Sequence, residues 1–97
     1  MAYAFQYDVP ADAEFYRRVA AEIGDERPKG VVAHLVVESD GGLRHIGVWE
    51  SREDWERFRS ERLGPALGRV FAAVGVRNVP PPPPEQELDL VDVVVER

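Results

Sequence analysis

Cysteine is absent from this chain of 97 residues. Without thiols the protein can form no disulfide bond, no zinc–thiolate site and no cysteine nucleophile. Long apolar runs are also missing, and none approaches the roughly 20 residues that a membrane-spanning helix needs. The N-terminus carries no basic segment followed by an apolar run, which is the pattern of a signal peptide. We therefore expect a cytoplasmic protein.

Lysine is nearly absent, and the chain has no basic stripe. The sequence holds eleven arginines and one lysine, and its net charge is −6. Nucleic-acid binding requires a surface that neutralises phosphates, so this balance argues against a nucleic-acid partner. The arginines of residues 52–62 alternate with acidic residues, which is typical of a solvated helix face with ion pairs three or four positions apart. The preference for arginine over lysine, together with much Ala, Val, Gly and Pro, indicates a bacterium with GC-rich codons.

The composition is that of a soluble globular protein, with 44% apolar and 31% charged residues. The length allows one domain, residues 1–97, and is too short for two. A chain of this size buries only about 60% of its unfolded surface, so a partner that covers more surface would add stability.

The first part of the chain reads as a strand followed by a helix. Residues 3–9 alternate large and small side chains, the period of a strand, and Pro10 ends the pattern. Residues 11–23 place apolar side chains at helical spacing, and Gly24 supplies the C-terminal stop.

Residues 31–50 predict a β-hairpin. Two β-rich segments flank the turn segment 39–42, Ser-Asp-Gly-Gly. An Asp-Gly step between strands favours a type I′ turn, in which both central residues have positive φ. That turn brings His34 opposite Gly47.

The remaining sequence predicts a second helix and a last strand. Ser51 is the expected N-cap, and Gly64–Pro65 should break or bend the helix before it continues to about residue 74. The five prolines Pro80–Pro84 form a stiff connector within the domain; as a ligand for a proline-binding module they are the less favoured alternative. A strand at about residues 86–95 completes the order βαββαβ. Its apolar residues change phase, which indicates a bulge or a strand covered on both faces.

This order predicts an α+β, ferredoxin-like fold with a four-stranded antiparallel sheet and both helices on one face. One face of the hairpin is wholly apolar and is expected to bind the helices: Val31, Ala33, Leu35, Val37, Ile46 and Val48. The other face is apolar except for two imidazoles: Val32, His34, Val36, Leu43, His45 and Trp49.

The second face would then be exposed, and a contiguous apolar patch usually marks an interface. We therefore expect a homodimer whose sheets pack face to face as a two-subunit α/β barrel, since two-fold symmetry is the commonest form of self-association. The expected interface residues are Val32, Val36, Leu43, Val91, Val93 and Val95.

Four segments resemble a known group of proteins. They are His34-Leu-Val-Val-Glu, Asp40-Gly-Gly-Leu, Val48-Trp-Glu-Ser-Arg-Glu-Asp-Trp-Glu-Arg-Phe and Glu61-Arg-Leu-Gly-Pro-Ala-Leu. They resemble small, mostly uncharacterised bacterial proteins related to the antibiotic biosynthesis monooxygenases, in the dimeric α/β-barrel superfamily. The resemblance covers the middle third of the chain closely and implies a homodimer. The superfamily includes cofactor-free oxygenases, haem-degrading enzymes, isomerases and members with no known reaction, so fold alone does not decide the activity. Haem degradation there uses a histidine on a helix, which neither predicted helix contains.

His34 and His45 are the candidate catalytic residues. They share one face of neighbouring strands, and imidazole titrates near neutral pH, so they could act as a general base and its partner. The alternative is that both line the dimer interface and bond across it. As metal ligands they lack a convincing third partner, so neither a metal nor another cofactor is expected.

Five aromatic residues could line a pocket for a small aromatic ligand, although aromatic residues at helical spacing are more often core. They are Trp49, Trp55, Phe58, Phe15 and Phe71. Two hypotheses follow. One is a cofactor-free enzyme of the monooxygenase or isomerase kind; the other is a non-catalytic dimer that binds a small ligand or is purely structural. An enzyme requires a pocket of roughly 300 Å³ that touches a histidine or the aromatic residues.

Overall fold

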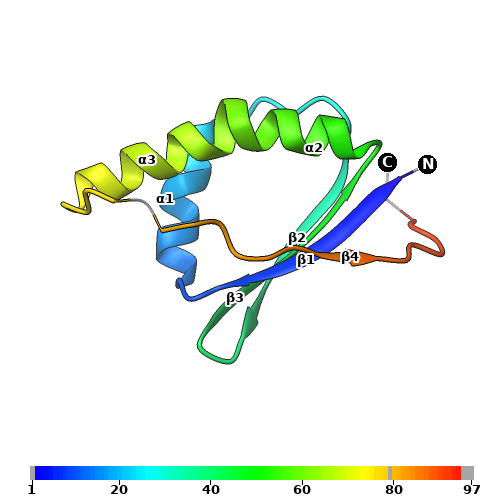
Figure 1. Cartoon of the computed structure of the whole chain (residues 1–97), viewed down its shortest axis with the longest axis horizontal. Coiled ribbons are helices and arrows are strands. Elements are labelled where there is room, and N and C mark those ends of the chain that lie inside the picture. The colour runs from blue at the N-terminus through cyan, green and yellow to red at the C-terminus, as the bar shows by residue number, and fades with distance from the viewer. Residues whose placement is uncertain (1, 79, 95–97) are drawn as a thin grey trace.

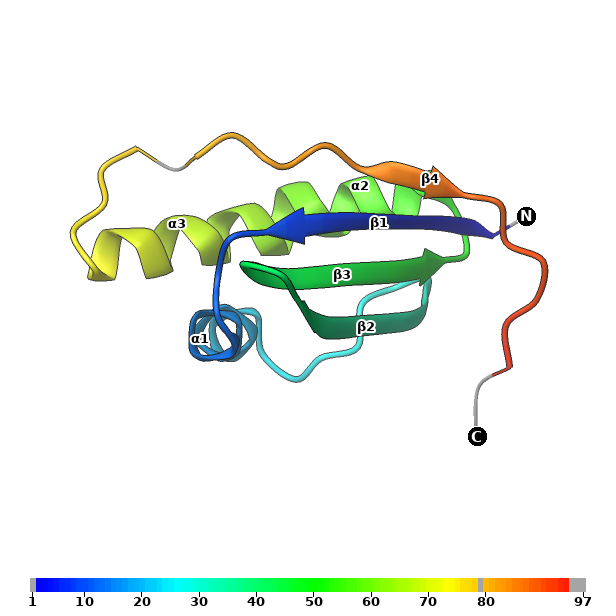
Figure 2. The ribbon, with the colours of Figure 1, turned by 90° about the horizontal axis from the view of Figure 1, so that it is seen from below.

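The computed structural model describes residues 2–78 and 80–94. Its elements are β1 (Tyr3–Val9), α1 (Ala13–Ile23), β2 (Val31–Ser39), β3 (Gly42–Trp49), α2 (Arg52–Phe58), α3 (Gly64–Ala73) and β4 (Gln86–Leu88). The strands form one antiparallel sheet in the order β2-β3-β1-β4, and the helices lie on one side of it (Figures 1 and 2). The ferredoxin-like α+β fold expected from the sequence is confirmed.

Local capping signals set the helix ends. Asp12 is the N-cap of α1, and its Oδ1 accepts a hydrogen bond from the Phe15 amide at 2.8 Å. The helix therefore begins at Ala13, two residues later than the apolar spacing predicted. Ser51 caps α2 in the same way, because its Oγ accepts from the Asp54 amide at 3.1 Å.

The helix is not broken at Gly64–Pro65; it continues through a widened turn directly before them. A π-helical turn, Arg59–Leu63, joins α2 to α3 without an interruption. The Gly64 amide donates to the Arg59 carbonyl, five residues back. Proline has no N–H and crowds the carbonyl four residues before it, and the wider turn directly before Pro65 relieves both constraints.

The hairpin has the expected register, with His34 opposite Gly47 and Val36 opposite His45. Its turn is not of type I′, which would require positive φ at both Asp40 and Gly41. Gly41 has φ 78°, but among the residues described no residue other than glycine has positive φ. A register shift between Val31 and Ala33 places Val31 opposite Trp49, and Val32 is the extra residue.

The expected assignment of the two hairpin faces was wrong. The helices pack on the face that carries Leu43, His45 and Trp49, and all three residues are buried. Leu35 and Val37, on the face expected to bind the helices, are 49% and 42% exposed. We call the face away from the helices the open face.

Aromatic side chains from β1 and α2 explain this reversal. Phe5, Trp49 and Trp55 form one buried cluster, and the centroids of the Phe5 and Trp55 rings lie 4.5 Å apart. Phe5 fits here because Gly47, directly opposite it, has no side chain. Aromatic side chains bury the most apolar area, so the face that can collect them becomes the inner one. Leu63 packs against this cluster and against a second one, Val19, Ala66 and Val70.

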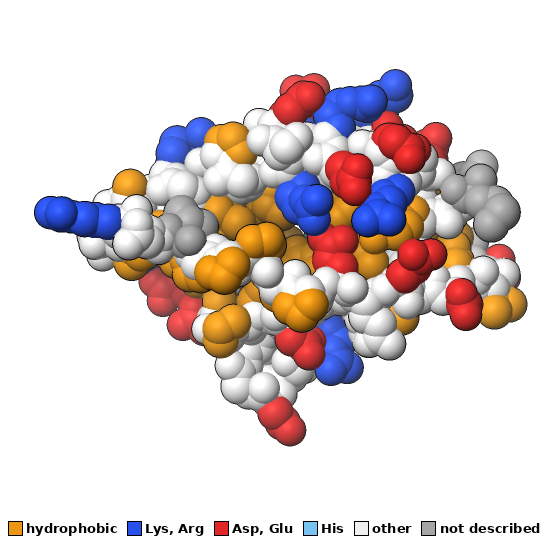
Figure 3. Space-filling view, viewed as in Figure 1, with side chains coloured by type: hydrophobic (Ala, Val, Ile, Leu, Met, Phe, Trp, Pro, Cys, Tyr) orange, Lys and Arg blue, Asp and Glu red, His pale blue; other side chains and the backbone are white. Residues whose placement is uncertain are grey.

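The last strand is much shorter than expected. Only residues 86–88 pair with β1, and residues 89–94 lie outside the sheet, so the expected strand to residue 95 was wrong; Val95 itself falls outside the described residues. Residues 80–84, the proline strap, run back along β1 to β4 (Figure 2). Hydrophobic side chains gather between the strap and the helices and are flanked by charged ones (Figure 3). No helix among residues 2–78 and 80–94 is long and apolar enough to cross a membrane.

Candidate functional site

The two histidines are direct neighbours on the inner face of the sheet. Nε2 of His34, on β2, lies 3.2 Å from Nδ1 of His45, on β3. The distance is that of a hydrogen bond, in which one ring nitrogen donates and the other accepts. The rings meet edge to face, at 69°. The structure therefore brings together the pair that the sequence predicted.

The two imidazoles lie in different surroundings. His34 is exposed on the edge strand β2, whereas His45 is only 8% exposed. Tyr7 stacks on His45 at a centroid distance of 4.8 Å, and Tyr16 of α1 approaches it edge-on at 5.5 Å. The pair therefore has one imidazole at the surface, His34, and one among aromatic rings in the interior, His45.

Burial keeps this pair neutral at pH 7. Desolvation, and then the nearby charge of His34, lower the pKa of His45 to about 4. Partial burial lowers the pKa of His34 as well, although the residue as a whole is exposed. A neutral His34 can accept a proton, which suits general base catalysis, while His45 stays neutral and can accept a hydrogen bond from the protonated ring.

The five aromatic residues expected to line one pocket fall into two groups. Trp49, Trp55 and Phe58 contact one another at centroid distances of 5.2–6.1 Å, and both tryptophans are 1% exposed. Phe15 and Phe71 form a separate pair, 5.2 Å apart, beside the second core cluster. Trp49 and Trp55 are therefore packed core, whereas Phe58, Phe15 and Phe71 are half-buried.

Glu85 joins three segments of the chain by hydrogen bonds, a role that the sequence did not predict. Its carboxylate accepts hydrogen bonds from Trp55 Nε1 at 3.0 Å, from Arg59 Nη1 at 2.9 Å and from the Tyr3 hydroxyl at 3.4 Å. It therefore fastens the end of the proline strap to the helix and to β1. A lone glutamate after five prolines carries no signal for this role.

The indole N–H of Trp49, unlike that of Trp55, has no acceptor. Its Nε1 is fully buried and has no hydrogen-bond partner among the residues described. A buried donor without a partner costs about 1–3 kcal/mol.

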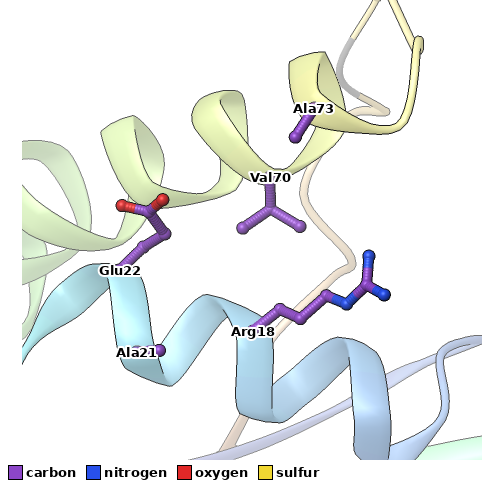
Figure 4. Close-up of a pocket in the computed structure, with 5 residues that line it drawn as sticks. All are labelled: Arg18, Ala21, Glu22, Val70 and Ala73. Carbon is purple, nitrogen blue, oxygen red and sulfur yellow. The ribbon is translucent and has the colours of Figure 1, made fainter.

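Two hollows are described on this chain. One, of about 360 Å³, lies between α1 and α3, where Arg18, Ala21 and Glu22 face Val70 and Ala73 (Figure 4). It touches neither histidine and no aromatic residue.

The other hollow, of about 290 Å³, lies between β1 and the proline strap, and we call it the strap hollow. It is lined by Gln6, Tyr7, Asp8, Pro84 and Gln86. It reaches Tyr7, the ring stacked on His45, but neither histidine itself. Neither hollow is the pocket expected for an enzyme, because neither touches a histidine or any of the five aromatic residues. The enzyme hypothesis therefore depends on the histidine pair, whose His34 is exposed, and not on a pocket.

The residues that the sequence analysis assigned to the dimer interface do not share one exposed face of the structure. Leu43 is 3% exposed and Val36 half-buried on the inner face, beneath the helices, and Val32 is the extra residue of the bulge. Val91 and Val93 are exposed, at 97% and 37%. Val95 lies outside the described residues.

No group of three metal-binding side chains occurs within the described part of the chain. The histidine pair supplies two nitrogen ligands, one fewer than the three protein ligands of a typical catalytic zinc site.

Comparison with known proteins identifies similar folds. No family model matches the chain, and no curated protein sequence matches it either. A protein of unknown function from Nitrosomonas europaea superposes with a TM-score of 0.59 at 13% identity, over 99% of this chain and 93% of that one. SnoaB, a cofactor-independent oxygenase from Streptomyces nogalater, superposes with a TM-score of 0.51 at 18% identity, over 98% of this chain and 96% of that one. At these identities the likeness shows the fold alone. It agrees with the ferredoxin-like fold that the sequence predicted.

Proposed function

We propose that this protein is a homodimeric, cofactor-free enzyme of the monooxygenase or isomerase kind that acts on a small aromatic compound. His34 is the general base, and His45 is its hydrogen-bonded partner. The observation that carries this proposal is the 3.2 Å contact between an exposed and a buried imidazole. The similarity in fold to SnoaB, a cofactor-independent oxygenase, agrees with it.

The histidine pair suits the removal of a proton from an acidic hydroxyl or an activated carbon. At pH 7 both rings are neutral, so His34 has a lone pair available when substrate arrives. The positive charge formed on His34 is stabilised by its hydrogen bond to the neutral His45, while the aromatic rings beside His45 exclude water. The substrate anion can then reduce molecular oxygen and form a carbon–oxygen bond as a hydroperoxide, which loses water to leave one oxygen atom on the product, or it can take the proton back at another carbon.

The homodimer is proposed on the open face. Leu35 and Val37 are exposed there, and Arg44 and Asp8 form an ion pair on the same face, with Nε to Oδ1 at 2.9 Å. A second copy of the chain fits this face because it brings the same apolar centre and the same two charges of opposite sign, related by a two-fold axis. The interface is therefore proposed on the face opposite to the one that the sequence indicated.

The catalytic proposal is tested by screening phenolic and quinol-like compounds for oxygen consumption and for isomerised products, in buffer that contains a metal chelator. We expect turnover by the native protein and at least a hundredfold loss in His34→Gln, since a general base contributes about 10² to 10⁴ in rate. Arg17→Gln, a polar change at an exposed position of α1, is the control and should leave the rate unchanged. A variant His34→Gln with the native rate would refute the role of the pair.

The assembly is tested by light scattering. The native protein should have twice the chain mass of 10.9 kDa. Leu35→Asp should give a monomer, because an unpaired charge in an apolar interface costs several kcal/mol. Val74→Asp is the matched control, since Val74 is 50% exposed and lies at the end of α3, away from the open face. A native protein that is monomeric at all concentrations would contradict the dimer.

One observation favours the alternative, a non-catalytic module that binds a small ligand. Neither hollow touches a histidine, and the aromatic residues between sheet and helices are closely packed. If no compound is turned over and the dimer forms, this alternative takes precedence.

A further inference from the structure

Residues 89–94, which we call the arm, follow β4 and leave the end of the sheet (Figure 2). All six are exposed and belong to no helix or strand. β-branched residues of the arm favour a strand, but Ala4 already pairs with Leu88 and β1 begins one residue before it. The sheet of the same chain therefore offers the arm no neighbour. Four of its residues are large and apolar, with exposed fractions between 37% and 97%: Leu90, Val91, Val93 and Val94.

The strand β2 has an unused edge that matches the arm in character. The order β2-β3-β1-β4 leaves one side of this nine-residue strand without a neighbouring strand in the described part of the chain. The proline strap occupies the opposite edge of the sheet, where proline supplies no N–H for pairing. A long open edge with apolar side chains readily pairs with another strand. Leu35 and Val37 of β2 are exposed, so six of the eight large apolar residues exposed in the described chain lie on β2 or the arm.

The proposed dimer brings the arm of one copy to β2 of the other. A two-fold axis that runs parallel to the strands, between the two open faces, reverses the strand order and places β4 of one copy over β2 of its partner. Packed sheets lie about 10 Å apart, and an extended chain advances about 3.3 Å per residue. Three residues of the arm therefore cross the distance, and residues 92–94 reach the edge of β2. In its own sheet β2 is three strand spacings away, about 14 Å, which leaves too little of the arm to pair.

We propose that the arm of each copy pairs with the free edge of β2 in the other copy and places Asp92 beside His34. Alternation puts Val91 and Val93 on one face of the arm and Asp92 on the other. The face with the two valines suits the dimer interior, where the apolar side chains of β2 lie. Asp92 then falls on the inner face, which carries His34. The inference rests on the proposed dimer and adds a residue of the second copy to the histidine site.

A carboxylate from the second copy complements His34. The ionisable groups near His34 are His45, the Tyr7 and Tyr16 phenols beside His45, and Glu38, four positions along the same face of β2. Burial lowers the pKa of His34, and no carboxylate of the described chain offsets this effect. A carboxylate beside the ring favours its protonated form, which is the form made when the general base takes a proton. Asp92 is therefore a positioning residue that acts on His34.

The exchange of arms is tested by NMR on a dimer that combines one isotope-labelled and one unlabelled full chain. We expect contacts between residues 91–94 of one copy and β2 of the other in spectra that select signals between copies. A native protein that is monomeric would refute both the dimer and the exchange. A dimer whose arm contacts only its own copy, or does not contact β2, would refute the exchange alone.

Hydrogen exchange of β2 shows whether the edge is covered. Every second amide of β2 points away from β3, and in the native dimer these amides should be protected. Val93→Asp should make them exchange at least tenfold faster, because it puts a charge into the apolar face of the arm. Val76→Asp is the matched control, since Val76 is 38% exposed and Val93 37%, and Val76 follows α3. Outward amides of β2 that exchange equally fast in the two variants would count against the pairing.

The role of Asp92 is tested by titrating the His34 ring in NMR spectra. Asp92→Asn should lower the pKa of His34, because the carboxylate that favours the protonated ring is lost. Asp89→Asn removes the same charge from the arm next to β4 and should leave the pKa of His34 as it is in the native dimer. The same pKa of His34 in both variants would overturn the placement of Asp92.

Discussion

Replacement of Glu85 by alanine should weaken the whole fold, because one carboxylate satisfies donors from three elements. Trp55 is 1% exposed, so its Nε1 would lose its partner without gaining water, at a cost of about 1–3 kcal/mol. The ion pair with Arg59 is partly exposed, with side chains 41% and 19% accessible, and adds up to about 1 kcal/mol. The Tyr3 contact, at 3.4 Å, is weak. We therefore expect a loss of about 2–4 kcal/mol in the free energy of unfolding.

A loss of this size is a large share of the roughly 5–15 kcal/mol that stabilises a typical domain. In a chain of this length it should lower Tm by about 10–25 °C. The assay is urea unfolding monitored by tryptophan fluorescence, with Glu85→Gln as an intermediate case that keeps an acceptor for Trp55 and loses the charge. Glu87→Ala is the matched control, because this exposed β4 residue pairs with Phe5 through its backbone. We expect it to change stability by less than about 0.5 kcal/mol.

Native-state hydrogen exchange tests where the Glu85 contact acts. Without it, the amides that pair β1 with β4 should exchange faster than those that pair β1 with β3, because the strap is released first. A Glu85→Ala variant as stable as the Glu87→Ala control would refute the reasoning.

The remaining predictions concern packing and pH. Gly47→Ala should lower the free energy of unfolding by about 1–3 kcal/mol, because its Cβ would lie 2.7 Å from a buried phenylalanine ring. Gly68→Ala, with no atom within 4 Å, should raise it by about 0.5–1 kcal/mol. Equal urea midpoints for the two variants would contradict this. His45, whose pKa falls from 6.5 to about 4 on folding, should contribute about 3 kcal/mol that is fully present above pH 6.5 and is lost as the pH falls through about 4. Urea unfolding across this range should therefore show a steeper acid loss in the native protein than in His45→Phe, and parallel curves would contradict it.

Local patterns in the sequence were sufficient for the element order and the hairpin register. The alternation of residues 3–9, the cap Ser51 and the Asp-Gly step all act within a few residues. Because each signal depends on neighbours in the chain, each can be read without the fold. The register it predicted, with His34 opposite Gly47, also placed the two imidazoles on one face, so the histidine pair followed from sequence.

The choice of inner face depended on contacts between distant segments. Both hairpin faces are apolar, so hydrophobic pattern alone could not distinguish them. Phe5 of β1 and Trp55 of α2 determine which face is the inner one. Both pack against Trp49, and Phe5 occupies the space over Gly47, which has no side chain. The dimer interface that we propose therefore lies on the face opposite to the one expected from the sequence.

The end of the last strand and its attachment were likewise properties of the folded chain. The strongly β-prone residues 89–94 run past the start of β1 and lie outside the sheet, whatever their propensity. Glu85 accepts hydrogen bonds from three residues that lie 26 to 82 positions before it in the sequence, and the strap hollow lies where prolines face a strand edge. Spacing along the chain determines helices, turns and register, whereas only tertiary structure determines which side chains from separate elements share one enclosed space.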